Sequence, residues 1–139
     1  MAAAADDPIV GVWNLNLAKS RYSPGPTPQR QTMKFEPAGG DALKLTSDTV
    51  FPDGRATHAG YTARFDGKEN PVHDNPDADT SAMRRIDAYT TETTWKKDGK
   101  VTITSRRSVS KDGKTLTITQ KGTNGRGRPV DNVTVWDRQ

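Results

Sequence analysis

Cysteine and histidine, which often act as catalytic or zinc-binding residues, are scarce in this 139-residue chain. The sequence contains no cysteine and only two histidines, His58 and His73, so a thiol nucleophile and a zinc–thiolate site are excluded. No Gly-x-Ser-x-Gly elbow accompanies the histidines, which disfavours a serine hydrolase. His58 could bind haem if it faced an apolar interior, but a histidine on the surface or at a rim is the favoured interpretation.

Two polar segments have spacings that occur in ligand-binding loops. Asn75–Asp79 places oxygen ligands at alternate positions, as the first half of a calcium loop does, but Thr80 and Ile86 occupy the expected glycine and glutamate positions. An Asx-rich turn explains that segment without a metal. Gly122–Arg128 lacks the strand-then-helix context of a phosphate loop and indicates a turn. We therefore expect neither a metal nor a cofactor.

The charge of the chain favours a solvated surface over a nucleic-acid interface. Lys and Arg total 21 and Asp and Glu total 17, giving a net charge of +4 and a pI near 9.5. The basic residues are spread along the chain and mixed with acidic ones, so they form no basic footprint. No run approaches the ~18 apolar residues of a transmembrane helix.

Alternating apolar and polar residues predict strands rather than helices. Hydrophobic residues make up 31% and aromatic residues 6% of the chain, which fits either a partly disordered chain or a barrel with a partly polar interior, and the strand patterns favour the barrel. Besides one strand between residues 55 and 65, the expected strands are Ile9–Asn16, Gln29–Glu36, Ala42–Phe51, Ser81–Asp87, Tyr89–Lys96, Lys100–Ser110, Lys114–Lys121 and Val130–Arg138.

Four Asp-Gly pairs punctuate these strands. They lie at 53–54, 66–67, 98–99 and 112–113, and Asp-Gly tolerates the positive φ of a tight hairpin. We therefore predict one all-β domain over residues 1–139, an up-and-down antiparallel barrel of about eight to ten strands with a flexible start at 1–8. The proline-rich segment Ala18–Pro28 is expected to cross the barrel as an extended loop, with Tyr22 over one end, and Glu69–Thr80 is expected to be a rim loop.

The alternation also predicts which side chains point inward. Arg107 shares a face with Val101, Ile103 and Val109, and a buried guanidinium needs a carboxylate, water or an anionic ligand. In the fourth strand the phase is ambiguous, because either Tyr61 or His58 could lie on the inner face. The candidate ligand-binding residues are Arg107, Trp95, Tyr61, Arg64, His58, Arg85, Trp136 and Tyr22.

The first and last strands resemble those of the calycins, the superfamily of lipocalins, fatty-acid-binding proteins and lipocalin-like bacterial proteins. The resemblance rests on Gly11-Val12-Trp13, the meander, and Val133–Arg138. It implies that Trp13 lies at the closed end, beside the space left by Gly11 and under the side chain of Arg138. Prolines replace the helical lid of fatty-acid-binding proteins, and Thr134 and Trp136 replace their Arg and Tyr carboxylate clamp.

These observations predict that the interior binds a small hydrophobic or amphipathic molecule, anionic ligands included. A barrel filled by its own side chains is nearly as well supported. Two other functions stay open, namely a small-molecule isomerase, cyclase or hydrolase that uses interior Arg, His or Tyr, and a protein-interaction module. We expect a monomer or weak dimer without a membrane span. Met1–Pro8 is similar to the start of a mature exported protein, which favours a periplasmic or secreted bacterial protein.

Overall fold

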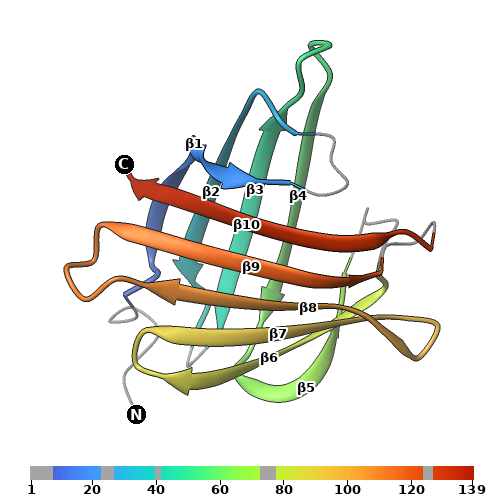
Figure 1. Cartoon of the computed structure of the whole chain (residues 1–139). Coiled ribbons are helices and arrows are strands. Elements are labelled where there is room, and N and C mark those ends of the chain that lie inside the picture. The colour runs from blue at the N-terminus through green and yellow to red at the C-terminus, as the bar shows by residue number, and fades with distance from the viewer. Residues whose placement is uncertain (1–7, 23–26, 40–41, 73–77, 124–126) are drawn as a thin grey trace.

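The chain forms a ten-stranded antiparallel sheet that curls on itself (Figure 1). This computed structural model describes residues 8–22, 27–39, 42–72, 78–123 and 127–139. The strands are β1 (Gly11–Arg21), β2 (Arg30–Pro37), β3 (Leu43–Val50), β4 (Ala56–Ala63), β5 (Asp66–Pro71), β6 (Thr80–Asp87), β7 (Thr90–Lys97), β8 (Lys100–Val109), β9 (Thr115–Thr123) and β10 (Pro129–Arg138). Within those ranges there is no helix, and hence no helical span for a membrane.

The strands follow one another in a meander whose first and last strands, β1 and β10, pair with each other. The order in the sheet is β4-β3-β2-β1-β10-β9-β8-β7-β6-β5, with β1 antiparallel to β10. In Figure 1, β2–β4 run at a steep angle to β6–β10, so that two walls face each other across an interior. β4 and β5 are the two edges of the sheet. The predicted all-β meander is confirmed.

β1 joins the two walls because its pairing shifts midway. Gly11–Asn14 pair with β2, while pairing with β10 is interrupted between Asn16 and Arg21. In the interruption the Ser20 hydroxyl accepts a hydrogen bond from Val135 N at 2.9 Å, replacing a main-chain partner. The predicted first strand ended at Asn16, and the structure extends it to Arg21 because this side chain maintains the ladder across the bulge.

Three of the four Asp-Gly pairs lie in hairpins. Asp98 and Gly99 form a two-residue turn with φ of 52° and 80° between β7 and β8, as expected for a tight hairpin. The pair at 66–67 is the exception, because it lies within the irregular first half of β5, and β5 does not pair with the preceding strand β4. The predicted hairpin there is wrong, and the predicted rim loop is strand as far as Pro71.

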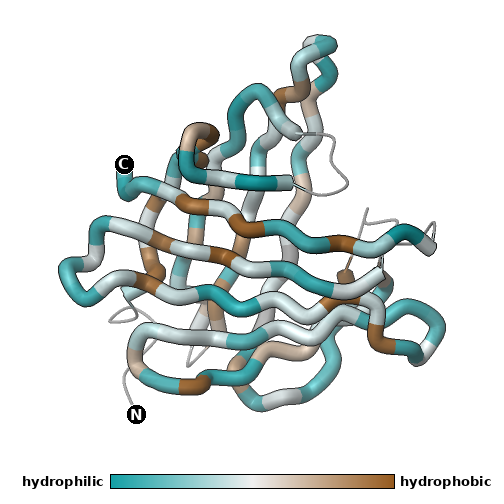
Figure 2. Tube along the Cα trace, viewed as in Figure 1, coloured by the Kyte–Doolittle hydropathy of each residue, from teal (hydrophilic) through white to brown (hydrophobic). Residues whose placement is uncertain are grey.

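Buried apolar side chains gather in two clusters inside the barrel. The larger cluster, here the closed-end cluster, comprises Ile9, Trp13, Met33, Phe35, Leu43, Leu45, Val109, Leu116, Ile118 and Trp136. The smaller cluster, here the second cluster, comprises Ala78, Trp95, Ile103 and Val130. In Figure 2 the apolar positions are separated by polar ones along most strands, as expected when one face of each strand is buried.

Candidate functional site

The closed end is built around Trp13. Its side chain is 0% exposed, and Nε1 donates a hydrogen bond to Ile9 O at 2.8 Å. The guanidinium carbon of Arg138 lies 4.2 Å from the centre of the ring system, a distance typical of cation–π packing. The predicted cover of Trp13 by Arg138 is confirmed.

Arg138 is fixed by main-chain carbonyls on both sides of the tryptophan. Nε donates to Gly113 O at 2.6 Å, Nη1 donates to Val10 O at 2.8 Å, and Nη2 donates to Pro8 O. Gly11 leaves the space that the guanidinium needs, because a Cβ there would lie 2.4 Å from Nη1, and its φ of +137° also disfavours other residues. This end is therefore a structural closure.

A polar layer separates the closed-end cluster from the second cluster. We define it by the buried polar residues Thr91, Thr93, Ser105, Arg107 and Thr134. The pairing register arranges the residues of this wall in rows. One row is Thr134, Ile118, Arg107, Thr91 and Arg85, and the next is Asn132, Gln120, Ser105, Thr93 and Met83. The alternation of β7 and β8 thus brings Arg107 and several hydroxyls to the same wall, and Arg85 of β6 lies at the end of the first row.

Arg107 is the charged member of the polar layer. Its side chain is buried, with the residue 4% exposed, as the alternation of β8 predicted. Nη1 donates to the Thr93 hydroxyl at 3.2 Å, and the guanidinium carbon lies 5.6 Å from the centre of the Phe35 ring on the opposite wall. A buried guanidinium keeps its charge, so this layer is a positively charged region between two apolar ones.

Two buried hydroxyls on the same wall make no hydrogen bond within the described part of the chain. They are Ser105 Oγ and Ser81 Oγ, each on a residue that is 1% exposed. Ser105 lies beside Arg107 on β8, and Ser81 lies opposite Trp95 in the second cluster. Buried hydroxyls in native proteins almost always bond to protein, water or ligand. The alternation of β8 placed Ser105 on the same face as Arg107, but the sequence assigned no role to either serine.

A series of hydrogen-bonded polar side chains lies on the facing wall. The Tyr22 hydroxyl donates to Gln31 Oε1 at 3.4 Å, and Gln31 Nε2 donates to Ser47 Oγ at 2.9 Å. Burial raises the pKa of the Tyr22 phenol to about 12, so this side chain stays a neutral donor. Tyr22 was expected to cover one end of the barrel, and its side chain is partly buried. The following residues 23–26 lie outside the described ranges.

The remaining aromatic candidates divide between the two clusters. Trp95 is buried in the second cluster. Trp136 belongs to the closed-end cluster, where Nε1 donates to the Thr134 hydroxyl at 2.9 Å. The side chain of Tyr61 lies outside the described part of the structure, although its backbone pairs with Leu45.

The other basic candidates are not gathered around Arg107. Arg85 is partly buried at the barrel edge, with its guanidinium 4.5 Å from the Phe65 ring centre. His58 is exposed, and its Nδ1 lies 2.6 Å from an Asp48 carboxylate oxygen, so it lies on the outer face rather than the inner one. Arg64 is likewise exposed. Pairing of β4 with β3 thus resolves the position of His58, which the sequence left ambiguous, because His58 lies opposite the exposed Asp48.

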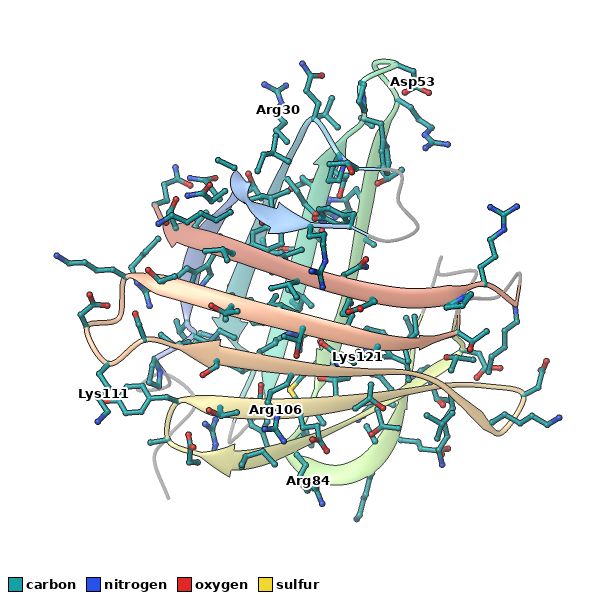
Figure 3. The ribbon with its side chains drawn as sticks, viewed as in Figure 1. Arg30, Asp53, Arg84, Arg106, Lys111 and Lys121 are labelled. Atoms are coloured by element: carbon teal, nitrogen blue, oxygen red, sulfur yellow. The ribbon has the colours of Figure 1, made fainter. Side chains whose placement is uncertain are left out.

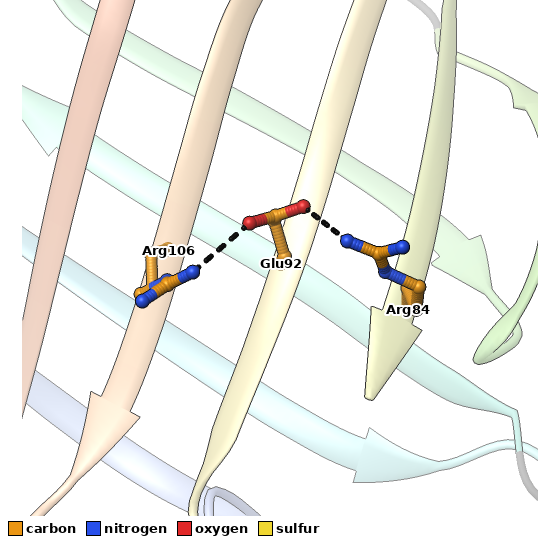
Figure 4. A network of polar contacts seen from close by, with 3 residues as sticks. All are labelled: Arg84, Glu92 and Arg106. Atoms are coloured by element: carbon orange, nitrogen blue, oxygen red, sulfur yellow. Dashed lines mark hydrogen bonds and ion pairs between the residues drawn. The ribbon is translucent and has the colours of Figure 1, made fainter. Parts of the chain in front are cut away.

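The outer face of the same wall carries its own charged group. Glu92 lies between Arg84 and Arg106, with oxygen–nitrogen distances of 2.8 and 3.2 Å (Figure 4). Hydrogen bonds from Arg106, then from Arg84, hold the pKa of Glu92 below its ordinary value. Figure 3 shows both arginines on this wall, together with Lys121. Arg106 and Arg107 are therefore sequence neighbours on opposite faces of β8.

The described residues contain no cluster of three or more potential metal ligands. The calcium-like segment Asn75–Asp79 lies mostly outside the described ranges. Its last residue, Asp79, accepts a hydrogen bond from Asp98 N at 3.1 Å. This contact connects the segment to the β7–β8 turn.

Solved structures share this architecture at low sequence identity. Wild-type UnaG, a fluorescent protein, matches with a TM-score of 0.62 and 16% identity, over 94% of this chain and 96% of that chain. The likeness extends over the whole antiparallel meander, so this chain shares its β-barrel fold with that protein. Zebrafish ileal bile acid-binding protein complexed with cholic acid matches with a TM-score of 0.58 and 12% identity, over 95% and 99% of the two chains.

A redesigned β-barrel also matches, with a TM-score of 0.58 and 14% identity, over 99% of this chain and 96% of that one. No protein-family model matches the chain, and no curated protein matches it in sequence. At these identities the likeness concerns the fold, and function has to be argued from the residues of the interior.

Proposed function

We propose that the barrel interior binds a small amphipathic molecule whose anionic group contacts Arg107. The observation that carries this proposal is the buried guanidinium in a hydroxyl-lined layer between two apolar clusters. A positive charge with hydroxyl donors around it suits a carboxylate, sulfonate or sulfate. The apolar clusters on either side suit the hydrocarbon part of the same molecule.

One of the similar structures supports the part of this proposal that concerns binding of a small molecule. The zebrafish protein is named for bile acid binding and was solved with cholic acid, a small amphipathic acid. The anionic preference of the present chain rests on Arg107 alone, because its barrel shares only 12% identity with that protein.

A pair of fluorescent probes tests the proposal. Anilinonaphthalene sulfonate is anionic, whereas phenylnaphthylamine has nearly the same ring system without the sulfonate. We expect the wild-type protein to bind both, and Arg107→Gln to weaken the sulfonate by about tenfold while changing the neutral probe little, since a bond to a charged group is worth roughly 1.5–3 kcal/mol.

Arg106→Gln is the matched control, because this neighbouring arginine lies on the outer face beside Glu92. It should bind both probes as the wild type does. The proposal is wrong if the wild type binds neither probe, or if the two variants change the sulfonate affinity equally. Native mass spectrometry of protein purified without denaturant then identifies a co-purifying acid.

A further inference from the structure

Ser105 and Ser81 occupy two different positions along the wall that carries Arg107. Ser105 stands two residues before Arg107 on β8 and pairs with Thr93, which accepts the Arg107 hydrogen bond. Ser81 stands on β6 and pairs with Trp95, one row nearer to the second cluster. Both residues are 1% exposed. The chain thus presents one hydroxyl within the charged layer and one beyond it.

The Ser105 hydroxyl belongs to the surroundings of the cation. Ser105, Thr93 and Arg107 are neighbours on two paired strands, with Thr93 opposite Ser105. Ser105 Oγ has no hydrogen-bond partner in the described part of the chain. An anion that contacts the guanidinium would have an oxygen within reach of this hydroxyl, which can donate to it. Ser105 is therefore suited to bind the same charged group as Arg107.

The Ser81 hydroxyl lies next to the second cluster, between Trp95 of β7 and the partly buried Asn70 of β5. It lies opposite Trp95, and the other members of the second cluster are Ala78, Ile103 and Val130. Its Oγ also has no hydrogen-bond partner among the described residues. From Thr93, Ser81 is one strand across and two residues along, which corresponds to about 8 Å between these positions. A neutral polar group of a ligand could therefore reach Ser81 while its anion stays at Arg107.

We propose that the interior contains two polar subsites for a single ligand, an anion subsite at Arg107, Thr93 and Ser105 and a hydroxyl subsite at Ser81. The ligand class is an amphipathic acid that carries a hydroxyl about 8 Å from its anionic group. This inference rests on the proposed function for its anion subsite. The hydroxyl subsite adds selectivity, because a buried group that must hydrogen-bond discriminates strongly against a ligand without the matching group.

Three related acids test the hydroxyl subsite by displacement of anilinonaphthalene sulfonate. They are decanoate, decanoate hydroxylated at the eighth carbon, and decanoate hydroxylated at the third carbon. In an extended chain the eighth carbon lies close to the required separation, and the third carbon cannot reach it. Ser81→Ala should weaken binding of the first hydroxy acid by about tenfold and change the other two less than about twofold.

Two further serine variants complete the experiment. Ser105→Ala should weaken all three acids to a similar extent, because it acts on their shared carboxylate. Ser108→Ala is the control, since this residue of β8 lies on the other face, with its hydroxyl 3.4 Å from that of Thr90, and it should leave all three unchanged. Thermal melting of Ser81→Ala should stay level or rise, because the variant removes a buried hydroxyl that has no protein partner.

The outcomes separate the two proposals. One outcome is that the acids bind with affinities that depend on Arg107 but that Ser81→Ala changes equally or not at all. In that case the hydroxyl subsite is wrong and the proposed function stands. If no acid binds the wild type, or binding is independent of Arg107, both proposals fall. A lower melting temperature of Ser81→Ala with uniform loss of binding would assign Ser81 a purely structural role.

Discussion

Arg138 and Arg107 are two of the arginines that pack over aromatic rings in this barrel, and their surroundings differ. The guanidinium of Arg138 lies 4.2 Å from the centre of Trp13 and donates to three main-chain carbonyls. The guanidinium of Arg107 lies 5.6 Å from the centre of the Phe35 ring, and its Nη1 donates to the hydroxyl of Thr93. One contact is made at the closed end and the other in the middle of the interior.

The kind of acceptor separates the two roles. Carbonyls are held in place by the backbone, so the bonds of Arg138 connect three segments of chain and resist exchange. A hydroxyl can rotate and both donate and accept, so the bond between Arg107 and Thr93 can rearrange when an anion arrives. The first arrangement stabilises the barrel, and the second is suited to binding. The predictions below test this division, from the largest expected effect to the smallest.

Trp13→Ala should cause the largest loss of stability. The side chain is 0% exposed and lies at the centre of the closed-end cluster, so its removal leaves a cavity and should lower the free energy of unfolding by about 3–5 kcal/mol. Urea unfolding monitored by circular dichroism measures the change. Tyr89→Ala is the control, because Tyr89 is 39% exposed, and a Trp13 variant as stable as that control would contradict the role of the closed end.

Arg138→Ala should destabilise the protein by about 2–4 kcal/mol, because it deprives several main-chain acceptors of a charged donor and uncovers Trp13. Gly11→Ala should also destabilise it, since the new Cβ would meet the Arg138 guanidinium. The steric part of that cost disappears when Arg138 is absent. The double variant should therefore lose less stability than the sum of the two single losses, and full additivity would show that the two residues do not compete for space.

Arg107→Met should impair binding without lowering stability, the opposite of what we expect for Arg138→Ala. A flexible apolar side chain of similar length fits between the apolar clusters, and replacing a buried charge in this way is often neutral or stabilising by about 1–4 kcal/mol. We expect an unfolding free energy equal to or above that of the wild type, together with loss of sulfonate-probe binding. A loss of stability as large as that of Arg138→Ala would show that both arginines are structural.

The sequence predicted the closed end better than the polar layer, for physical reasons. The contact between Trp13 and Arg138 could be predicted because a large indole must be covered. The resemblance to calycins indicated that a residue of the last strand covers it. Arg107 followed from alternation along β8, which a buried strand has to maintain. Ser81 was not identified, because the sequence of a strand does not show whether a serine hydroxyl makes a hydrogen bond.

The misplaced elements have a common cause in pairing that is not local. The Asp-Gly pair at 66–67 has the composition of a hairpin turn, yet β4 and β5 are opposite edges of the sheet. The interior phase of β4 is set by its register with β3, which places His58 opposite Asp48 on the outer face. Neither the lack of pairing between β4 and β5 nor the register of β4 can be predicted from the residues of the segment itself.

The outer face of the same wall offers the smallest effect and a contrast with Arg107. Hydrogen bonds from Arg106 and Arg84 lower the pKa of Glu92 from its ordinary value of 4.5. The stability from this ionised form is present above pH 4.5 and is lost as the pH falls through the lowered pKa. Glu92→Gln should therefore be less stable than the wild type at neutral pH, by under about 1 kcal/mol.

Urea unfolding of both proteins across the acidic range measures this difference, which should shrink toward zero below the pKa of the folded wild type. Adding salt at neutral pH should reduce it as well, because the arginines are partly exposed. Probe binding should be unchanged in Glu92→Gln, since Glu92 lies on the opposite face from Arg107. A stability difference that widens in acid would contradict this explanation of Glu92, and a change in probe affinity would show that the two faces of this wall are coupled.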